Sequence, residues 1–379
     1  MYYIALRMLF RDRAKYVLLL AALVFAALLI TQQAAVFCGL MRWSTAMLRN
    51  SYASIWVVDP KVEQCNESNP LRNIDLMRVR SVTGVKWGMP VSFSIIEAQM
   101  RFGEFKSILL IGLDPSTLAG VPRDMVSGNV KDLMGTQTVL IDQFGVERLS
   151  EGSSRALQVG DSFQINDIEA HIIGICKTER SFFSYPFVYT SFNNAQRFRP
   201  PQRKELSAVI VQPQEGKTAK EVARAIEQAT GLRAFTDDEF FWSTIWWMFR
   251  NTGIPISVGT TVILGFIVGI AVAGQTFYSF VLENLPHFGI MKAMGASNKQ
   301  LSKMMLVQSF TVGLMGYGIG VGLATAFGWY VFFRGTPPFF LTYELLGITL
   351  AAILIICSFA VYLGVRRVAR LEPTAVFRA

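Results

Sequence analysis

The sequence predicts a membrane protein of four transmembrane helices, with a large mixed α/β domain inserted between the first two. Four uncharged apolar runs, at residues 16–40, 256–281, 305–333 and 345–364, are long enough to cross a bilayer, which takes about 20 predominantly apolar residues. The intervening residues 41–255 are long enough to bury a core of their own. With 52% hydrophobic residues, the 379-residue chain is too apolar for an ordinary soluble protein.

Basic residues gather beside the apolar runs, and this predicts the orientation in the membrane. Residues 42–255 carry 24 Lys and Arg against 23 Asp and Glu, whereas the rest of the chain carries 12 against 4. Most of that excess lies at the two chain ends and in residues 282–304, while the short loop 334–344 contains only Arg334. By the positive-inside rule, both termini and 282–304 are expected in the cytoplasm and the insert outside. The positive charge therefore indicates topology and not nucleic-acid binding.

The first 15 residues are expected to form an amphipathic lead-in at the cytoplasmic surface, with apolar side chains towards lipid and arginines towards headgroups. The first apolar run is too long for a signal peptide and lacks a clear cleavage site, which predicts a retained helix. No Gly or Pro occurs between Met41 and Tyr52, so this helix is expected to continue out of the membrane as a stalk.

Within the insert, residues 54–235 mix strand and helix patterns, which predicts an α/β fold. Strands are expected at 55–58, 91–100, 105–113, 138–141, 163–165, 169–176, 187–189 and 207–211. Helices are expected at 71–82 with Asn73 as N-cap, after residue 141 through Leu149, and at 191–198 and 218–230. The second and third strands should pair as a hairpin.

The return to the membrane begins with Thr236-Asp-Asp-Glu239, which is typical of a capping box. An aromatic cluster follows: Phe240, Phe241, Trp242, Trp246, Trp247 and Phe249. Such a cluster just outside a span is typical of the aromatic belt at the membrane interface, with the three tryptophans as anchors. A surface that faces substrate is the alternative. Gly253 and Pro255 should end this helix before the second span.

The chain contains no pattern for catalysis. It has no GxxxxGK[ST] loop for ATP phosphates, no GxSxG and no HExxH, so it is not expected to be an enzyme or to bind a cofactor. Cys65 and Cys176 lie in the insert, where they form either a disulfide or two buried thiols. His171 and His287 are expected on opposite sides of the membrane, which argues against a shared metal site.

Residues 282–304 form a polar interval between the second and third spans, the only long one in the last third of the chain. Pro286 suits the first turn of a helix, and from Phe288 onward apolar residues recur at helical spacing. A break near Gly295, with Ser297 as the N-cap of the next helix, is expected. A short amphipathic helix here is suited to docking a cytosolic partner; a tight loop on lipid headgroups is the alternative.

The stretch Phe288-Gly-Ile-Met-Lys-Ala-Met-Gly-Ala-Ser297 resembles the signature of the FtsX/MacB-like permeases, the membrane subunits of mechanotransmission-type ABC transporters. The C-terminal stretch Arg367–Arg378 is similar to that family's ending. Instead of the family's acidic–basic run before the signature, this chain has Glu283-Asn-Leu-Pro-His287. The resemblance implies a coupling segment that contacts the ATPase through Glu283, Phe288, Gly289, Ile290, Lys292, Ala293, Gly295 and Ala296.

The same resemblance implies a multi-pass permease of the bacterial inner membrane that works as a homodimer with a dimer of cytoplasmic ATPase subunits, which bind ATP and Mg. Asp59-Pro60, Gly112–Pro115 and Thr252–Ile254 are similar to the subgroup related to the cyanobacterial heterocyst glycolipid exporter. That subgroup would add a periplasmic adaptor (a membrane fusion protein), an outer-membrane channel and amphiphilic cargo. The alternative is a non-transporting FtsX-like regulator that activates a periplasmic partner such as a cell-wall hydrolase.

The apolar spans carry two further signals. They contain no Asp, Glu, Lys or Arg, so a proton relay through the bilayer has no residues to use, and movement is expected to pass through the stalks at 41–52 and 236–250. Spans two and three are rich in glycine, including Gly265 and Gly269. These small faces allow close helix contact, either within one chain or at the seam of a homodimer.

Overall fold

The computed structural model describes residues 7, 13–101, 103–117, 119–153, 155–200, 206–334 and 336–369. The chain divides into two compact units, Met1–Leu40 with Gly253–Ala379, and Met41–Thr252. The first is helical and the second is a mixed α/β domain, so the predicted fold class is confirmed. Most of the predicted lead-in and tail lie outside the described residues.

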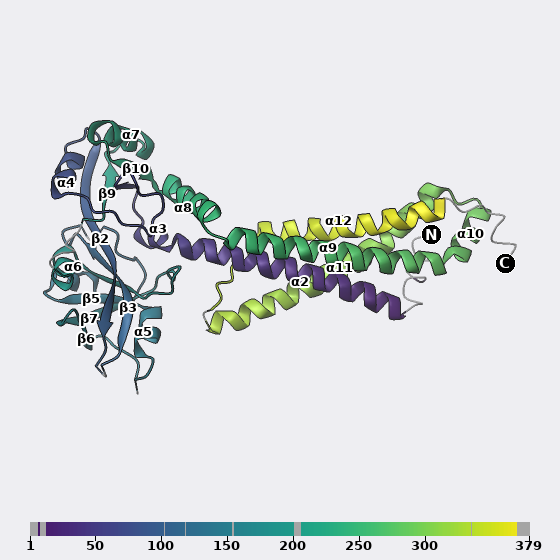
Figure 1. The fold of residues 1–379 in the computed structure, drawn as a ribbon, viewed down its shortest axis with the longest axis horizontal. Helices are drawn as coiled ribbons and strands as arrows, with labels where there is room; N and C mark the ends of the chain where they lie inside the picture. Colours follow the sequence, from purple (N-terminus) through teal and green to yellow (C-terminus); the bar gives the residue numbers. More distant parts are fainter. Residues whose placement is uncertain are drawn as a thin grey trace. The chain divides into compact units, whose positions relative to one another are not determined.

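The helical unit consists of four long helices: α2 (Arg13–Ser44), α9 (Ile254–Glu283), α11 (Asn298–Arg334) and α12 (Tyr343–Ala369). All four are long and apolar enough to cross a membrane, as the sequence predicts. Helix α12 lies beside both α9 and α11 (Figure 1). The shared core contains Leu23, Phe277, Met305 and Ile356, one from each helix.

Most glycines of the second and third spans allow neighbouring helices of this unit to pack closely. A Cβ on Gly269 would lie 2.9 Å from the Cβ of Ala26 in α2, and a Cβ on Gly316 would lie 2.8 Å from the Cβ of Leu23. These helix backbones therefore approach closely within one chain. Gly318 and Gly322 face no described atom within 4 Å.

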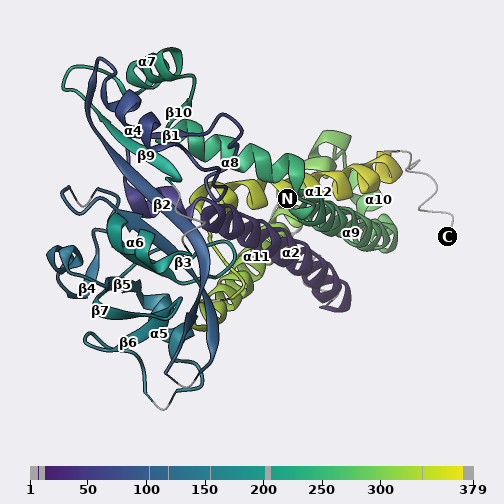
Figure 2. The same cartoon turned by 60° about the vertical axis from the view of Figure 1, so that its left-hand side comes forward.

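The second unit is built on one ten-stranded sheet of order β10-β1-β9-β2-β3-β8-β5-β7-β4, with β6 paired to β2 and β7. The strands are β1 (Ile55–Val58), β2 (Val85–Gln99), β3 (Phe105–Leu113), β4 (Met125–Gly128), β5 (Thr138–Asp142), β6 (Ser162–Ile165), β7 (Ile168–Cys176), β8 (Phe187–Ser191), β9 (Ala208–Pro213) and β10 (Arg233–Thr236). The helices are α3 (Ala46–Ser51), α4 (Asn73–Arg80), α5 (Gln143–Ser150), α6 (Phe192–Phe198), α7 (Ala219–Thr230) and α8 (Asp237–Asn251), with a 3-10 turn η1 (Val130–Met134). In Figure 2, α4 and α7 lie near β9 and β10, and α5 lies near β5 and β7.

Residues 55–58, which form strand β1, are an unbroken apolar run because both faces of the strand are covered. Ile55 and Val57 pack in one cluster with Val222 and Ile226 of α7. Trp56 and Val58 pack on the other face with Met47 of α3 and Phe240 of α8. Because both faces of the sheet are covered here, every residue of the strand is buried.

Several local predictions are confirmed. Strands β2 and β3 form the expected antiparallel hairpin. Helix α7 begins with a reciprocal capping box between Thr218 and Glu221 and ends at Gly231 in the left-handed conformation. The sequence did not predict two short strands, β4 and β10, because neither Met-Val-Ser-Gly nor Arg-Ala-Phe-Thr alternates apolar and polar residues. The N-cap of α4 is Arg72 and not Asn73, since the Asp75 carboxylate accepts the Arg72 N–H at 3.1 Å.

The predicted unbroken stalk from Met41 to Tyr52 is wrong, because the helix breaks at Thr45 between α2 and α3. The Ser44 hydroxyl donates to the Met41 carbonyl at 2.8 Å, and the Thr45 hydroxyl donates to it at 3.2 Å. These side chains compete with the helical main-chain bonds.

Of the two alternatives for Cys65 and Cys176, the structure shows buried free thiols. The Cys65 Sγ lies 3.3 Å from the Ser44 carbonyl, and the Cys176 Sγ lies 3.5 Å from the Ile141 carbonyl. Burial raises the pKa of each thiol to about 12, so neither is present as a reactive thiolate near neutral pH.

Candidate coupling site and stalk

Helix α10 (Leu285–Ala293) follows α9 directly, with Asn284 as the only residue between them. The Asn284 main-chain and side-chain N–H groups both donate to the Phe280 carbonyl, at 3.2 and 2.8 Å. The Asn284 carbonyl in turn accepts the N–H of Phe288 at 3.1 Å. Pro286 lies in the first turn, as predicted. The junction is hydrogen-bonded on both sides, which restricts the angle between the two helices.

The other end of α10 is a glycine turn. The N–H of Ala296 donates to the Met291 carbonyl and that of Gly295 to the Lys292 carbonyl, both at 3.0 Å, a Schellman motif. Gly295 has a φ of +95°, so a side chain at this position would strain the turn whether or not a partner binds. Ser297 then caps α11 by accepting the Gln300 N–H at 3.3 Å. The predicted break and cap are confirmed.

The coupling segment 282–304 has a buried face. Phe288 is fully buried in the helical core, with Val281, Leu301 and Met304. Gly289 and Ala296 are also buried. These three of the eight predicted contact residues therefore anchor the segment to its own unit.

The opposite face of this segment is exposed. Among the predicted residues, Glu283, Ile290, Ala293 and Gly295 are exposed and Lys292 is half-buried. Met294, which the prediction missed, is 75% exposed and lies four residues from Ile290, which is 48% exposed. The i,i+4 spacing places these two apolar side chains on one face, and that spacing was the available signal. Their contact with an ATPase stays a prediction.

Helix α8 carries the predicted tryptophans. It begins at Thr236, whose hydroxyl accepts the Glu239 N–H in a reciprocal box, as predicted. One face of the helix is buried through Phe240, Thr244, Ile245 and Met248. Trp242 and Trp246 are each 57% exposed on the other side, and Trp247 is half-buried. That the three tryptophans anchor the helix at the membrane interface stays a prediction.

Phe240 does not belong to the predicted exposed aromatic cluster. Its side chain is 2% exposed and stacks on Phe235 with ring centroids 4.6 Å apart. Position explains the difference, because Phe240 starts the buried i, i+4, i+8 row of α8.

Both stalk helices are tied to the α/β domain by the loop 63–66. The Cys65 N–H donates to the Thr244 hydroxyl of α8 at 3.0 Å. The Asn66 side chain donates to the Ser44 carbonyl at 2.8 Å. The loop thus satisfies the Ser44 carbonyl, which the helix break at Thr45 leaves without a helical partner. It also connects α2 to α8.

A second tie joins the first stalk to the segment after β7. Arg42 Nε donates to Glu179 Oε1 at 2.9 Å, and Arg49 Nε lies 3.2 Å from the same carboxylate. Asn50 pairs with the Glu179 main chain, donating to its carbonyl at 3.0 Å and accepting its N–H at 2.9 Å. Charge-assisted bonds of this kind are among the stronger ones. Nothing in the sequence pointed to Glu179, because its partners lie about 130 residues away.

Asp142 holds the start of the same segment. Its carboxylate accepts the Gly145 N–H at 2.8 Å, as the N-cap of α5, and the Thr178 hydroxyl at 3.2 Å. Burial raises the pKa of Asp142 to about 7, against the opposing effect of these bonds and of Arg180. The carboxyl group of Asp142, which accepts the hydroxyl of the residue just before Glu179, therefore titrates near neutral pH.

Two family models cover most of the chain. The model of the FtsX-like permease C-terminal domain matches residues 259–373, and that of the MacB-like periplasmic core domain matches residues 17–229, more than half of the chain. The chain belongs to the FtsX/MacB family of ABC transporter permeases. The FtsX-like match includes α10, and the MacB-like match includes Glu179 and both of its arginine partners.

Individual relatives of this permease are distant. An uncharacterized ABC transporter permease of Methanocaldococcus jannaschii is 24% identical over 174 residues, 45% of this chain and 43% of that protein. The chain thus aligns with under half the length of that relative. A second, from Mycobacterium tuberculosis, is 20% identical over 294 residues, 70% of this chain and 76% of that protein.

Two solved structures each match about half of this chain. The extracellular domain of the noncanonic ABC-type transporter YknZ from Gram-positive bacteria is 17% identical, with a TM-score of 0.35, over 48% of this chain and 98% of that one. The periplasmic region of MacB from Actinobacillus actinomycetemcomitans is 13% identical, with a TM-score of 0.38, over 54% and 96%.

Proposed function

We propose that this permease is the membrane subunit of an exporter in which separate cytoplasmic ATPase subunits, binding ATP and Mg, hydrolyse the nucleotide. The observation that carries the proposal is the geometry of α10. The helix and its C-cap expose Ile290 and Met294 to solvent, while Phe288 is buried in the helical core. Exposed apolar residues at helical spacing suit helix-in-groove docking to a partner. A buried aromatic anchor resists rotation of the helix when that partner moves.

The energy of hydrolysis is proposed to reach the α/β domain mechanically. The four predicted spans, at residues 16–40, 256–281, 305–333 and 345–364, contain no acidic or basic side chain. A proton relay through the bilayer is therefore disfavoured. Helix α2 ends in the residues that bind Glu179 and the 63–66 loop. Movement of this helix end would therefore displace both Glu179 and the 63–66 loop.

The setting is proposed to be the bacterial inner membrane, with both termini and 282–304 in the cytoplasm and 41–255 outside, and two copies of the permease per complex. An adaptor, an outer-membrane channel and amphiphilic cargo complete the proposal. They rest on the resemblance to the glycolipid-exporter subgroup alone.

The test is reconstitution. The permease in lipid nanodiscs is mixed with each candidate ABC ATPase encoded in the same genome, and ATP hydrolysis is measured with and without the permease. Complex formation and a change in hydrolysis rate support the proposal. Failure of every candidate ATPase to bind and respond overturns it. A complex that hydrolyses ATP and activates a cell-wall hydrolase, without export in cells, would indicate an FtsX-like regulator.

A further inference from the structure

The hydrogen-bond ladder of β2 is interrupted on one side. On its first side, β2 pairs with β3 along Val91–Gln99. On the other side, β9 pairs with β2 only as far as Val91, and β6 pairs only from Ala98. Among the described strands, none pairs with β2 between these two points on that side. At about 3.3 Å per residue, the interruption is roughly 20 Å long.

Local structure fixes both ends of this gap. Ser207 Oγ accepts the Phe93 N–H at 3.0 Å and donates to the Phe93 carbonyl at 3.3 Å. The preceding residue, Leu206, pairs with Leu71 instead of continuing along β2. At the far end, β6 turns back into β7 through Asn166 and Asp167, which have φ values of 51° and 63°. Neither neighbour can therefore extend into the gap.

The gap exposes main-chain donors and acceptors. Along a strand, the N–H and C=O groups of alternate residues point to the same side. Because Phe93 bonds to Ser207 on the gap side, Ile95 and Glu97 direct their main-chain groups into the gap. No described strand pairs with Ile95 there, whereas Glu97 precedes the Ala98–Ile165 pair and lies at the margin with β6. Unpaired groups along a strand edge form a ready template for pairing with another strand.

A cavity of about 840 Å³ lies along this stretch, within the range of ordinary ligand pockets. It is lined by every residue from Phe93 to Glu97. Successive side chains of a strand point to opposite faces, so a cavity that reaches both sets wraps around the edge of the strand and not one face alone.

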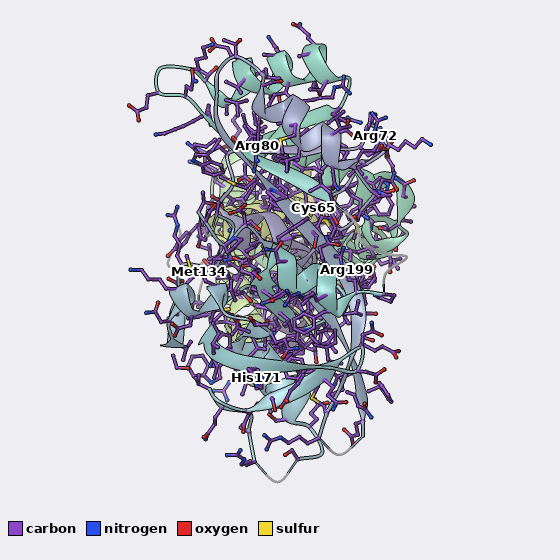
Figure 3. The ribbon with its side chains drawn as sticks, turned by 90° about the vertical axis from the view of Figure 1, so that its left-hand side faces the viewer. Cys65, Arg72, Arg80, Met134, His171 and Arg199 are labelled. Carbon is purple, nitrogen blue, oxygen red and sulfur yellow. The ribbon has the colours of Figure 1, made fainter. Side chains whose placement is uncertain are left out.

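The two walls differ in character. On one side the lining is largely apolar and aromatic, through Met47, Phe93, Leu109, Phe182, Phe183 and Tyr185. On the other side lie Phe198 and Arg199 at the end of α6, and Arg199, labelled in Figure 3, is 3% exposed. Glu97 and Asp167, both exposed, also line the cavity, which disfavours a strongly acidic occupant.

We propose that this edge binds an extended segment of a partner protein, which adds as a short strand between β9 and β6. The segment would bond to the main-chain N–H and C=O of Ile95, as in strand addition at other sheet edges. Its alternate side chains would enter the aromatic wall, which favours apolar residues at every second position with few acids between them. An acyl chain could fill the aromatic wall but would leave the main-chain groups unbonded. Since both ends of the gap are closed, the segment is a loop or chain terminus of a folded partner.

The test uses the full-length permease in lipid nanodiscs and a panel of capped, fluorescent heptapeptides in which Val, Ile, Leu or Phe alternates with Ser, Thr or Asn. We expect at least one member to bind in a polarisation assay. N-methylation of its amides at one set of alternate positions should weaken binding at least tenfold. N-methylation of the other set, the matched control, should change affinity less than threefold. Failure of every peptide to bind, or equal effects of both sets, overturns the proposal.

Two protein variants locate the site. Ser107, which lies opposite Glu97 in the β2–β3 ladder, lines the cavity, so Ser107→Trp should abolish peptide binding. Ser127→Trp on β4, at an exposed position outside the cavity, is the control and should bind normally. Ile95→Pro removes the N–H that faces the gap and breaks no bond to β3, so it should weaken binding at least tenfold while lowering the melting temperature less than Ser94→Pro, which loses a bond to β3. Normal binding by Ser107→Trp contradicts the assignment, as does displacement by phosphatidylcholine alone.

Discussion

Replacing two exposed apolar residues together, Ile290→Ser in α10 and Met294→Ser at its C-cap, should separate docking from folding. Ile290 is 48% exposed and Met294 is 75% exposed, so neither supports much of the permease's own core. Fully burying such a side chain is worth about 1.5–3 kcal/mol. Scaled by the exposed fractions, their burial against the ATPase would contribute about 1.8–3.7 kcal/mol. At about 1.4 kcal/mol per factor of ten, the affinity should fall roughly 20- to 400-fold.

The assay is a titration of nanodisc-embedded permease with its ATPase, read by interferometry, alongside thermal melting. The control pair is Ile74→Ser with Met77→Ser on α4, since both residues are 60% exposed in the other unit. We expect the control to bind normally and both variants to melt within about 2 °C of the parent. An affinity loss below threefold in the α10 variant, or an equal loss in the control, would refute the docking assignment. Unchanged binding with weaker partitioning of α10 into vesicles would support a loop on lipid headgroups.

Four further predictions concern other parts of the molecule. Phe288→Ala should lower the free energy of unfolding by about 3–5 kcal/mol, because it empties a fully buried site; a melting temperature equal to that of the parent would contradict its role as an anchor. The pKa of Asp142 is raised from 3.8 to about 7, so its contribution to stability is present below pH 4 and lost as the pH rises through 7. Asp142→Asn, which keeps an N-cap oxygen, should remove this loss and gain up to about 4 kcal/mol at pH 8; the melting temperatures of the two proteins should converge only below about pH 4. A cysteine placed at the exposed Glu215 should react with an impermeant thiol reagent in whole cells, and one at the exposed Asn298 should not. Labelling at 298 would contradict the predicted topology. Glu179→Gln, which keeps the shape but loses the charge opposite two arginines, should leave ATPase docking intact while reducing export several-fold; normal export would exclude this tie from the transmission path.

The sequence predicts the architecture well because its signals are strong and local. Four uncharged runs, a helix with both caps such as Thr218 to Gly231, and a hairpin with matching alternation each follow from neighbouring residues. The unbroken stalk was wrongly predicted because its break depends on residues far away in the sequence. The break at Thr45 depends on hydroxyls that compete for the Met41 carbonyl and on a loop that binds the exposed carbonyl. No local pattern contains that loop.

The coupling segment shows the same limit at the level of function. A family signature marks Phe288 and Ile290 alike, but it cannot say which of them faces a partner. Burial divides them, since Phe288 is enclosed by α9 and α11 while Ile290 is open. Helical spacing alone would not decide this, because either face of a short helix between two spans can be the buried one. The tertiary structure therefore converts one motif into two kinds of residue: an anchor, whose loss should unfold the segment, and a contact, whose loss should release the partner and leave the fold intact.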